Sequence, residues 1–190
     1  LDVAGPVYET LLQRMKDGGM ADAFETRRGQ NPLVDSGIRV ARHVDDDGER
    51  VSLAFVYKVA AEIGRLGDNI RYIRDAIHHD AILNTVISLP HRFDSILSHT
   101  RWASVGAINV INCHPVDHHE EGQIRDDGGI IHVCLNGDID NYQELRGDLL
   151  QKGVKVPGDV TTDTKIIPLL VADHMKDGCD VAEAFRRAVN

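Results

Sequence analysis

The chain has 190 residues, of which 30 are acidic and 21 are basic, so its formal charge is −9. This length predicts one domain, or at most one and a half, with a sizeable core. The acidic balance argues against nucleic-acid binding, which requires a basic face, and no apolar run approaches the roughly 20 residues of a membrane span. The three cysteines are not closely paired, which is typical of reduced thiols, so we expect a cytoplasmic protein.

Hydrophobic periodicity predicts two helices and a β-hairpin in the first half of the chain. The first helix covers 7–17 and ends at a glycine pair, whereas 20–35 is polar and is expected to be irregular. Alternating apolar residues between 38 and 57 predict a hairpin that turns at 45–48. Asp68 is then expected to cap a helix that carries a stripe of isoleucines.

The region 95–135 is expected to contain two short strands and a long loop. The first strand covers 95–100, and a compact apolar strand covers 130–135 and stops at Asn136. Between them, the charged and glycine-rich stretch 115–129 indicates a solvated loop.

Three helices are expected near the C-terminus. Asn141 with Glu144 has the spacing of a capping box for the first. The second follows 161–163, and Pro168 is expected either to kink it or to restart its first turn. Asp180 caps the last, whose inward residues are expected to be Val181, Phe185 and Ala188. Because strands and helices come in mixed groups, the predicted class is α+β.

Three separate segments place polar groups at the end of a predicted strand or the start of a helix. Arg101 is a fork-shaped donor suited to a carboxylate, and Asn136 beside the N–H of Gly137 is suited to an oxyanion. Asp163 lies in the first turn of a helix and can accept from an ammonium group. Together they describe a pocket for an α-amino acid with a reacting carbonyl. Taken singly, they are typical of a surface ion pair, a turn and a helix cap.

In order and spacing, these segments resemble the glutaminase domain of class II glutamine amidotransferases, the N-terminal-nucleophile (Ntn) type. The resemblance is closest to glucosamine-6-phosphate synthase and continuous over about 96–189, within a single domain covering 1–190. The matching segments are His99-Thr100-Arg101-Trp102-Ala103, Asn112-Cys113-His114-Pro115, Leu135-Asn136-Gly137, Asn141, Leu145-Arg146, Gly153 and Thr162-Asp163-Thr164.

The resemblance implies a binding residue for each end of glutamine. Arg101 would hold the α-carboxylate, Asp163 would take the α-ammonium, and Ser104 stands where the family usually has an assisting threonine. Trp102 would help to close the pocket, or would be a plain core aromatic. Close relatives carry a histidine at the position of Val105, so one hydrogen bond to glutamine is missing here.

The resemblance also implies the chemistry, the fold and the partners. Asn136 and the Gly137 N–H would stabilise the oxyanion formed when a thiolate attacks the side-chain amide of glutamine. The implied fold is an Ntn-hydrolase αββα sandwich of antiparallel sheets between helices, present here incompletely. The ammonia would pass to a sugar-isomerase or synthase domain that aminates fructose 6-phosphate, in a homo-oligomer without cofactor or metal.

In the family the nucleophile is an N-terminal cysteine whose α-amine is the general base. This chain begins with Leu1, and its cysteines are Cys113, Cys134 and Cys179. We therefore expect part of a longer polypeptide, inactive as a glutaminase by itself. The alternative is a non-catalytic module that binds glutamine or glutamate, or serves assembly.

A dense group of histidines and acids lies within 114–121. Its members are His114, Asp117, His118, His119, Glu120 and Glu121. Imidazole and carboxylate groups suit zinc and similar ions, so one interpretation is a metal site. The other is the solvated loop expected over 115–129, which is favoured because no helix pattern holds these side chains together.

Overall fold

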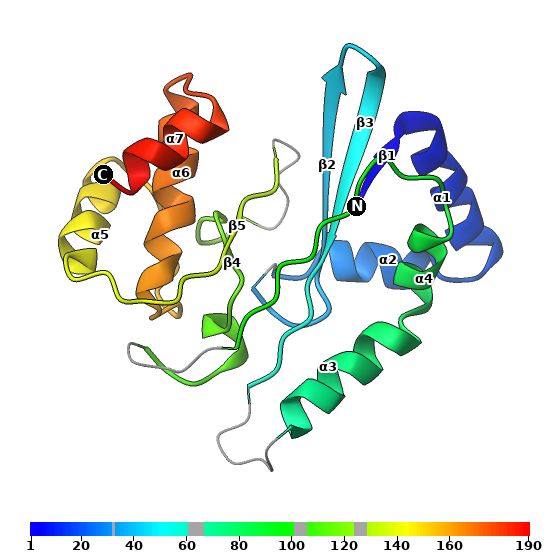
Figure 1. The fold of residues 1–190 in the computed structure, drawn as a ribbon, viewed down its shortest axis with the longest axis horizontal. Helices are drawn as coiled ribbons and strands as arrows, with labels where there is room; N and C mark the ends of the chain where they lie inside the picture. The colour runs from blue at the N-terminus through cyan, green and yellow to red at the C-terminus, as the bar shows by residue number, and fades with distance from the viewer. Residues whose placement is uncertain (32, 61–66, 101–105, 124–128) are drawn as a thin grey trace. The chain divides into compact units, whose positions relative to one another are not determined.

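The computed structural model describes residues 1–31, 33–60, 67–100, 106–123 and 129–190 (Figure 1). These residues form two compact units, one made of Leu1–Ile96 with 129–130 and the other of Leu97–Gln123 with Ile131–Asn190. The described residues contain seven α-helices, and their sheets are antiparallel. The expected α+β class is therefore confirmed.

The first unit contains a three-stranded antiparallel sheet. Its strands are β1 (Asp2–Ala4), β2 (Ile38–Asp45) and β3 (Gly48–Phe55), in the order β1-β3-β2. The register pairs Val40 with Leu53 and closes at Asp45 and Gly48, so the expected hairpin and its turn are confirmed. Gly48 has a φ of 112°, a conformation that side chains rarely adopt, which explains a glycine at the turn.

Four helices accompany this sheet: α1 (Gly5–Asp17), α2 (Ala21–Arg28), α3 (Asp68–His79) and α4 (Ala81–Ile87). Residues of α1, α2, α4 and the sheet share one core. Its buried members are Val3, Tyr8, Leu11, Met15, Phe24, Ile38, Val40, Val51, Leu53, Ile82, Val86 and Leu89.

Two expectations for these helices were incomplete. The stretch 20–35 is not wholly irregular, because Phe24 is buried and anchors α2, a helix too poor in apolar residues to show a period. The helix expected at Asp68 is present, but Gly67 is its N-cap residue and none of its side chains is buried. Its isoleucine stripe is therefore not part of the core.

Asp80 joins α2, the segment that follows β3, and α4 in the first unit. Its Oδ1 accepts hydrogen bonds from the N–H groups of Ile82 and Leu83 at 3.0 Å each, which caps α4. Its Oδ2 lies 2.7 Å from Nη1 of Arg27 and accepts from the hydroxyl of Tyr57 at 2.5 Å. Burial acts to raise the pKa of Asp80, but these partners outweigh it and lower the pKa below its ordinary value.

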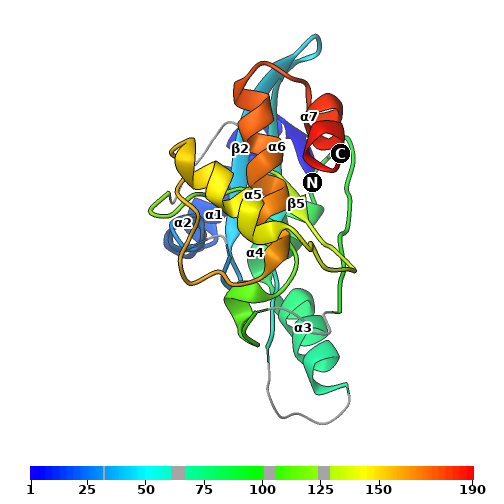
Figure 2. The same ribbon diagram turned by 90° about the vertical axis from the view of Figure 1, so that its left-hand side faces the viewer.

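The second unit is mainly helical. Strands β4 (Val116–Asp117) and β5 (His132–Val133) form a two-stranded sheet, and short 3-10 helices lie at Val110–Asn112 (η1) and Asp163–Lys165 (η2). The α-helices are α5 (Tyr142–Gln151), α6 (Ile166–Lys176) and α7 (Val181–Ala188). Figure 2 shows α6 beside both α5 and α7, and Leu149 of α5 packs with Ile166 and Leu169 of α6.

The expected helices of this unit are confirmed, and Pro168 lies in the first turn of α6, where the missing N–H has no cost. Asp180 caps α7 by accepting from the N–H of Glu183 at 2.8 Å. The inward face of α7 was predicted wrongly, because Val181 and Phe185 are exposed by 58% and 50% whereas Ala184 is fully buried. The small Ala184 side chain lets α7 approach its neighbour closely.

The expected strands were only partly right. Residues 95–100 are not in a strand, and the strand expected over 130–135 is confined to His132–Val133. Short apolar runs are ambiguous between a strand and buried irregular chain. No helix in the described ranges combines the length and apolarity needed to cross a bilayer.

Asp80→Ala should lower the free energy of unfolding by about 3 kcal/mol, through loss of a helix cap and of two hydrogen bonds to a largely buried carboxylate. Denaturant unfolding of the chain measures this. Asp46→Ala, at an exposed position, is the control and should change stability little. Equal effects of the two substitutions would contradict the assigned role of Asp80.

Candidate functional site

The segment 161–164 carries the expected ammonium acceptor, and its residues 162–164 are buried in the second unit. Thr162, Asp163 and Thr164 are 3%, 4% and 1% exposed. Buried polar groups need hydrogen-bond partners, and in this segment those partners come from the other predicted motifs. The segment is therefore where these motifs meet.

The carboxylate of Asp163 connects this segment to the Asn136-Gly137 loop. Its Oδ2 accepts the N–H of Ile139 at 2.7 Å, and its Oδ1 accepts the N–H of Thr164 at 2.8 Å. Ile139 follows Gly137 by two residues, and both Asn136 and Gly137 are exposed. The structure thus brings the expected oxyanion donors and the expected ammonium acceptor into neighbouring positions of one unit.

Asn112 fixes the other side of the same segment. Its Oδ1 accepts the N–H groups of Thr161 and Thr162 at 2.8 and 3.0 Å, and its Nδ2 donates to Oδ1 of Asn109 at 2.8 Å. The side chain is fully buried. Asn112 lies in one of the matching segments, but the sequence predicts no role for it, because its partners lie about fifty residues away in the sequence.

Gly106 and Ala107, which follow the Arg101 segment in the sequence, also contact Thr161. Gly106 has a φ of 87°, and a Cβ placed on it would lie 2.8 Å from the carbonyl carbon and oxygen of Thr161. The N–H of Ala107 donates to Oγ1 of Thr161 at 2.9 Å. Glycine is thus required here by both conformation and space.

Four residues singled out from the sequence have no structural description. Arg101, Trp102, Ser104 and Val105 lie outside the described residues. Their expected contacts with glutamine therefore stay predictions.

The stretch expected as a solvated loop contains a buried ionic cluster. Asp117, His119 and Lys165 are 2%, 3% and 1% exposed, and Nζ of Lys165 lies 2.5 Å from the carbonyl oxygen and 3.2 Å from Oδ1 of Asp117. Nδ1 of His119 is 3.0 Å from Oδ2 of Asp117. The loop prediction is wrong for 116–119, because local composition could not reveal an ion pair with a lysine 48 residues away.

Burial acts to raise the pKa of Asp117, but the hydrogen bond from His119 and the charge of Lys165 outweigh it and hold this pKa well below its ordinary value. Burial lowers the pKa of Lys165 against the attraction of Asp117. The lysine is thus less strongly protonated than a surface lysine, while the aspartate stays ionised at neutral pH.

Neither a metal centre nor a thiol site emerges from the described ranges. They contain no group of three or more histidine, cysteine or acidic side chains placed to bind one ion. The cysteines at 113, 134 and 179 are not joined by disulfide bonds and are of intermediate exposure. Sγ of Cys113 lies 3.4 Å from the carbonyl oxygen of Asn109.

Comparison with known proteins finds similarity over about half of the chain. It is 42% identical over 93 residues to the glutamine–fructose-6-phosphate aminotransferase (isomerizing) of Sulfurisphaera tokodaii and 43% identical over 95 residues to that of Synechocystis. The protein of the same name from Thermococcus kodakarensis is 38% identical over 94 residues. These alignments cover 49–50% of this chain and 14% of each relative. No protein-family model matches the chain.

Gly106→Ala should destabilise the chain by about 3 kcal/mol, because the left-handed conformation costs ~1–2 kcal/mol and the new Cβ also meets the Thr161 backbone. Gly153 is the matched control, since its φ is 85° but nothing lies within 4 Å of a Cβ there. Gly153→Ala should lower the free energy of unfolding only by the ~1–2 kcal/mol that the left-handed conformation costs. Thermal or denaturant unfolding measures both, and equal losses would refute close packing at Gly106.

Lys165→Met should lower the free energy of unfolding by about 3–5 kcal/mol at pH 7, because it leaves a buried carboxylate without its cation. In the unchanged chain, the stability from Asp117 is complete above the unfolded pKa of about 3.9 and is lost as the pH falls through its lowered native pKa. In the variant the pKa of Asp117 in the folded state rises. The difference in the free energy of unfolding between the two proteins should therefore be about 1 kcal/mol smaller at pH 3 than at pH 7. Denaturant unfolding at both pH values provides the measurement, and an equal deficit at both would contradict the ion pair.

Proposed function

We propose that the chain is the glutamine-binding part of the glutaminase domain of an amidotransferase that aminates fructose 6-phosphate. The similarity to glutamine–fructose-6-phosphate aminotransferases supports this. The aligned length of 93 residues in the S. tokodaii relative is close to that of the motif-bearing segment 96–189. The single observation that carries the proposal is the junction of motifs at 161–164, centred on the buried Asp163 carboxylate.

Asp163 suits the α-ammonium of glutamine. Each carboxylate oxygen accepts one short backbone N–H bond, which orients the group. Oδ1 also accepts longer bonds from the hydroxyls of Thr162 and Thr164, so the further lone pair for an ammonium is on Oδ2. Poor access to water makes such an ion pair stronger than one at the surface. In this proposal Arg101 binds the α-carboxylate, with Trp102 and Ser104 beside it.

Asn136 and Gly137 suit the other end of the substrate. Both are exposed, so a side-chain amide donor and a backbone N–H are accessible to an incoming carbonyl. Donors of this kind stabilise the negative charge that develops on the carbonyl oxygen during attack. Their neighbour Ile139 is held by Asp163, which relates the position of the oxyanion donors to that of the bound ammonium.

The proposed reaction needs a thiolate nucleophile. The thiolate forms a bond to the amide carbon of glutamine, the C–N bond breaks, and the leaving nitrogen takes the proton that the thiol released and departs as ammonia. Water then cleaves the glutamyl thioester and releases glutamate. We propose that an N-terminal cysteine outside residues 1–190 supplies this thiolate within an Ntn-type sandwich, and that a sugar-isomerase domain of a homo-oligomer receives the ammonia.

A non-catalytic module for glutamine or glutamate is the second candidate. The buried Asp163 carboxylate supports this candidate equally, because binding the ammonium group of an amino acid requires no thiolate. Both candidates use the same amino-acid site. They differ in whether glutamine is hydrolysed by the full-length protein.

Titration calorimetry of this chain with L-glutamine should detect binding, and Asp163→Asn should abolish it by removing the negative charge beside the ammonium. Asp140→Asn, the same change at a nearby exposed position, should leave binding unchanged. Arg101→Ala should also weaken binding, by at least tenfold. Binding that survives Asp163→Asn would refute the proposed site.

A glutaminase assay separates the two candidates. The isolated chain should release no glutamate, whereas the full-length protein should release it until its N-terminal cysteine is replaced. Glutamine binding without hydrolysis in the full-length protein would favour the non-catalytic module. Glutamate release by the isolated chain would contradict the requirement for a nucleophile outside it, and serine substitution at each of its cysteines would then identify the internal thiol.

A further inference from the structure

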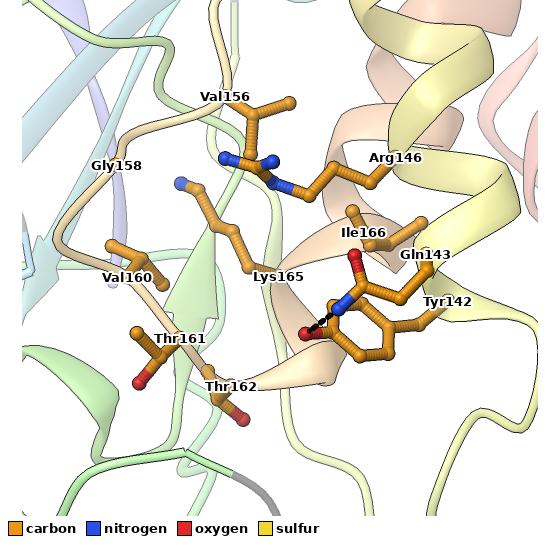
Figure 3. Close-up of a pocket in the computed structure, with 10 residues that line it drawn as sticks. All are labelled: Tyr142, Gln143, Arg146, Val156, Gly158, Val160, Thr161, Thr162, Lys165 and Ile166. Atoms are coloured by element: carbon orange, nitrogen blue, oxygen red, sulfur yellow. Dashed lines mark hydrogen bonds between the residues drawn. The ribbon is translucent and has the colours of Figure 1, made fainter.

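The second unit contains a small pocket beside the start of α5. Its volume is about 120 Å³, well below the roughly 300–1,000 Å³ of pockets for drug-sized ligands. Polar lining comes from Tyr142, Gln143, Arg146, Thr161, Thr162 and Lys165, with aliphatic side chains between them (Figure 3). The lining does not include Asp163, Asn136 or Gly137.

The lining carries positive charge without an acidic side chain. Arg146 and Lys165 are its charged members, in a chain whose net charge is −9. In Figure 3 both side chains extend toward the edge of the pocket beside Val156. Two cations directed to one small space favour an anion there.

The two cations are not equivalent. Lys165 is compensated, because its ammonium is bound to the carbonyl and carboxylate of Asp117 and the negative charge of Asp159 also acts on it. Arg146 is partly buried, yet within the described part of the chain its guanidinium makes neither an ion pair nor a hydrogen bond. Its fork of N–H donors matches the oxygens of a carboxylate or phosphate in a two-bond geometry.

The surrounding groups add to this preference. Helix α5 begins at Tyr142 beside the pocket, and the side chain of its N-cap residue Asn141 does not cap it. The positive end of the helix dipole therefore lies near the pocket, and this end favours negative charge. Thr161 and Thr162 line the opposite wall, where the Thr161 hydroxyl accepts the N–H of Ala107 and the Thr162 hydroxyl donates to Oδ1 of Asp163.

We propose that this pocket binds a small oxoanion, either a free ion or the terminal phosphate or carboxylate group of a larger ligand, with Arg146 as its principal partner. The site goes beyond the proposed glutamine site, because it uses none of the residues assigned to glutamine. Glutamine binding and oxoanion binding can therefore succeed or fail separately.

Nuclear magnetic resonance of the ¹⁵N-labelled chain tests this proposal. Inorganic phosphate should shift the Nε–H resonance of Arg146 and the amide resonances of Thr161 and Thr162 until they saturate, and sodium chloride at matched ionic strength should not. Sodium acetate forms the second arm. Saturation by phosphate alone supports a phosphate group as the ligand, by acetate alone a carboxylate, and by both a general oxoanion site.

Arg146→Gln should abolish saturation or weaken binding at least tenfold. The control is Arg74→Gln, which removes the same charge from an exposed residue of α3 in the first unit and should not change the affinity. Arg146→Lys keeps the charge but loses the fork of N–H donors, so it should bind the anion with intermediate affinity. This variant replaces Arg146→Gln in the test if Arg146→Gln misfolds. Non-saturating shifts, equal shifts with chloride, or an unchanged affinity in a folded Arg146 variant would overturn the proposal.

Discussion

The second unit depends on satisfying the buried polar groups of 162–164. A carboxylate, two hydroxyls and several backbone N–H groups are withdrawn from water there, and each unsatisfied group would cost about 1–3 kcal/mol. Asn112 accepts two of the N–H groups, the Thr161 hydroxyl accepts one from Ala107, and Asp163 accepts one from Ile139. The same bonds that remove this cost hold three distant segments around one acidic side chain.

The order of the motifs explains why the proximity of Asp163 to the Asn136-Gly137 loop could be anticipated from the sequence, although much of their surroundings could not. The roles of these residues in glutamine binding stay a prediction. Asp163 and the Asn136-Gly137 loop stood out because residue type and order matched a known pattern, and the structure places them in neighbouring positions. The burial of 116–119 could not be anticipated in this way. Its cause is the partner Lys165, and a charged stretch looks solvated until a distant opposite charge is known.

The same contrast holds for the fold. The β2–β3 hairpin and helices α1 and α5 follow from local periodicity and turn residues, and the structure confirms them. Helix α2 and the inward face of α7 depend instead on single buried side chains, Phe24 and Ala184. A pattern of several residues can be detected in a sequence, whereas a single contact chosen by tertiary packing cannot.

Both ends of the short helix η2 form hydrogen bonds with other parts of the chain. Asp163 at its first residue holds Ile139, and Lys165 at its last holds Asp117 of β4. These two contacts are two residues apart on one helical turn. The positions of the loop after β5 and of strand β4 are therefore both set by the same three residues, Asp163–Lys165.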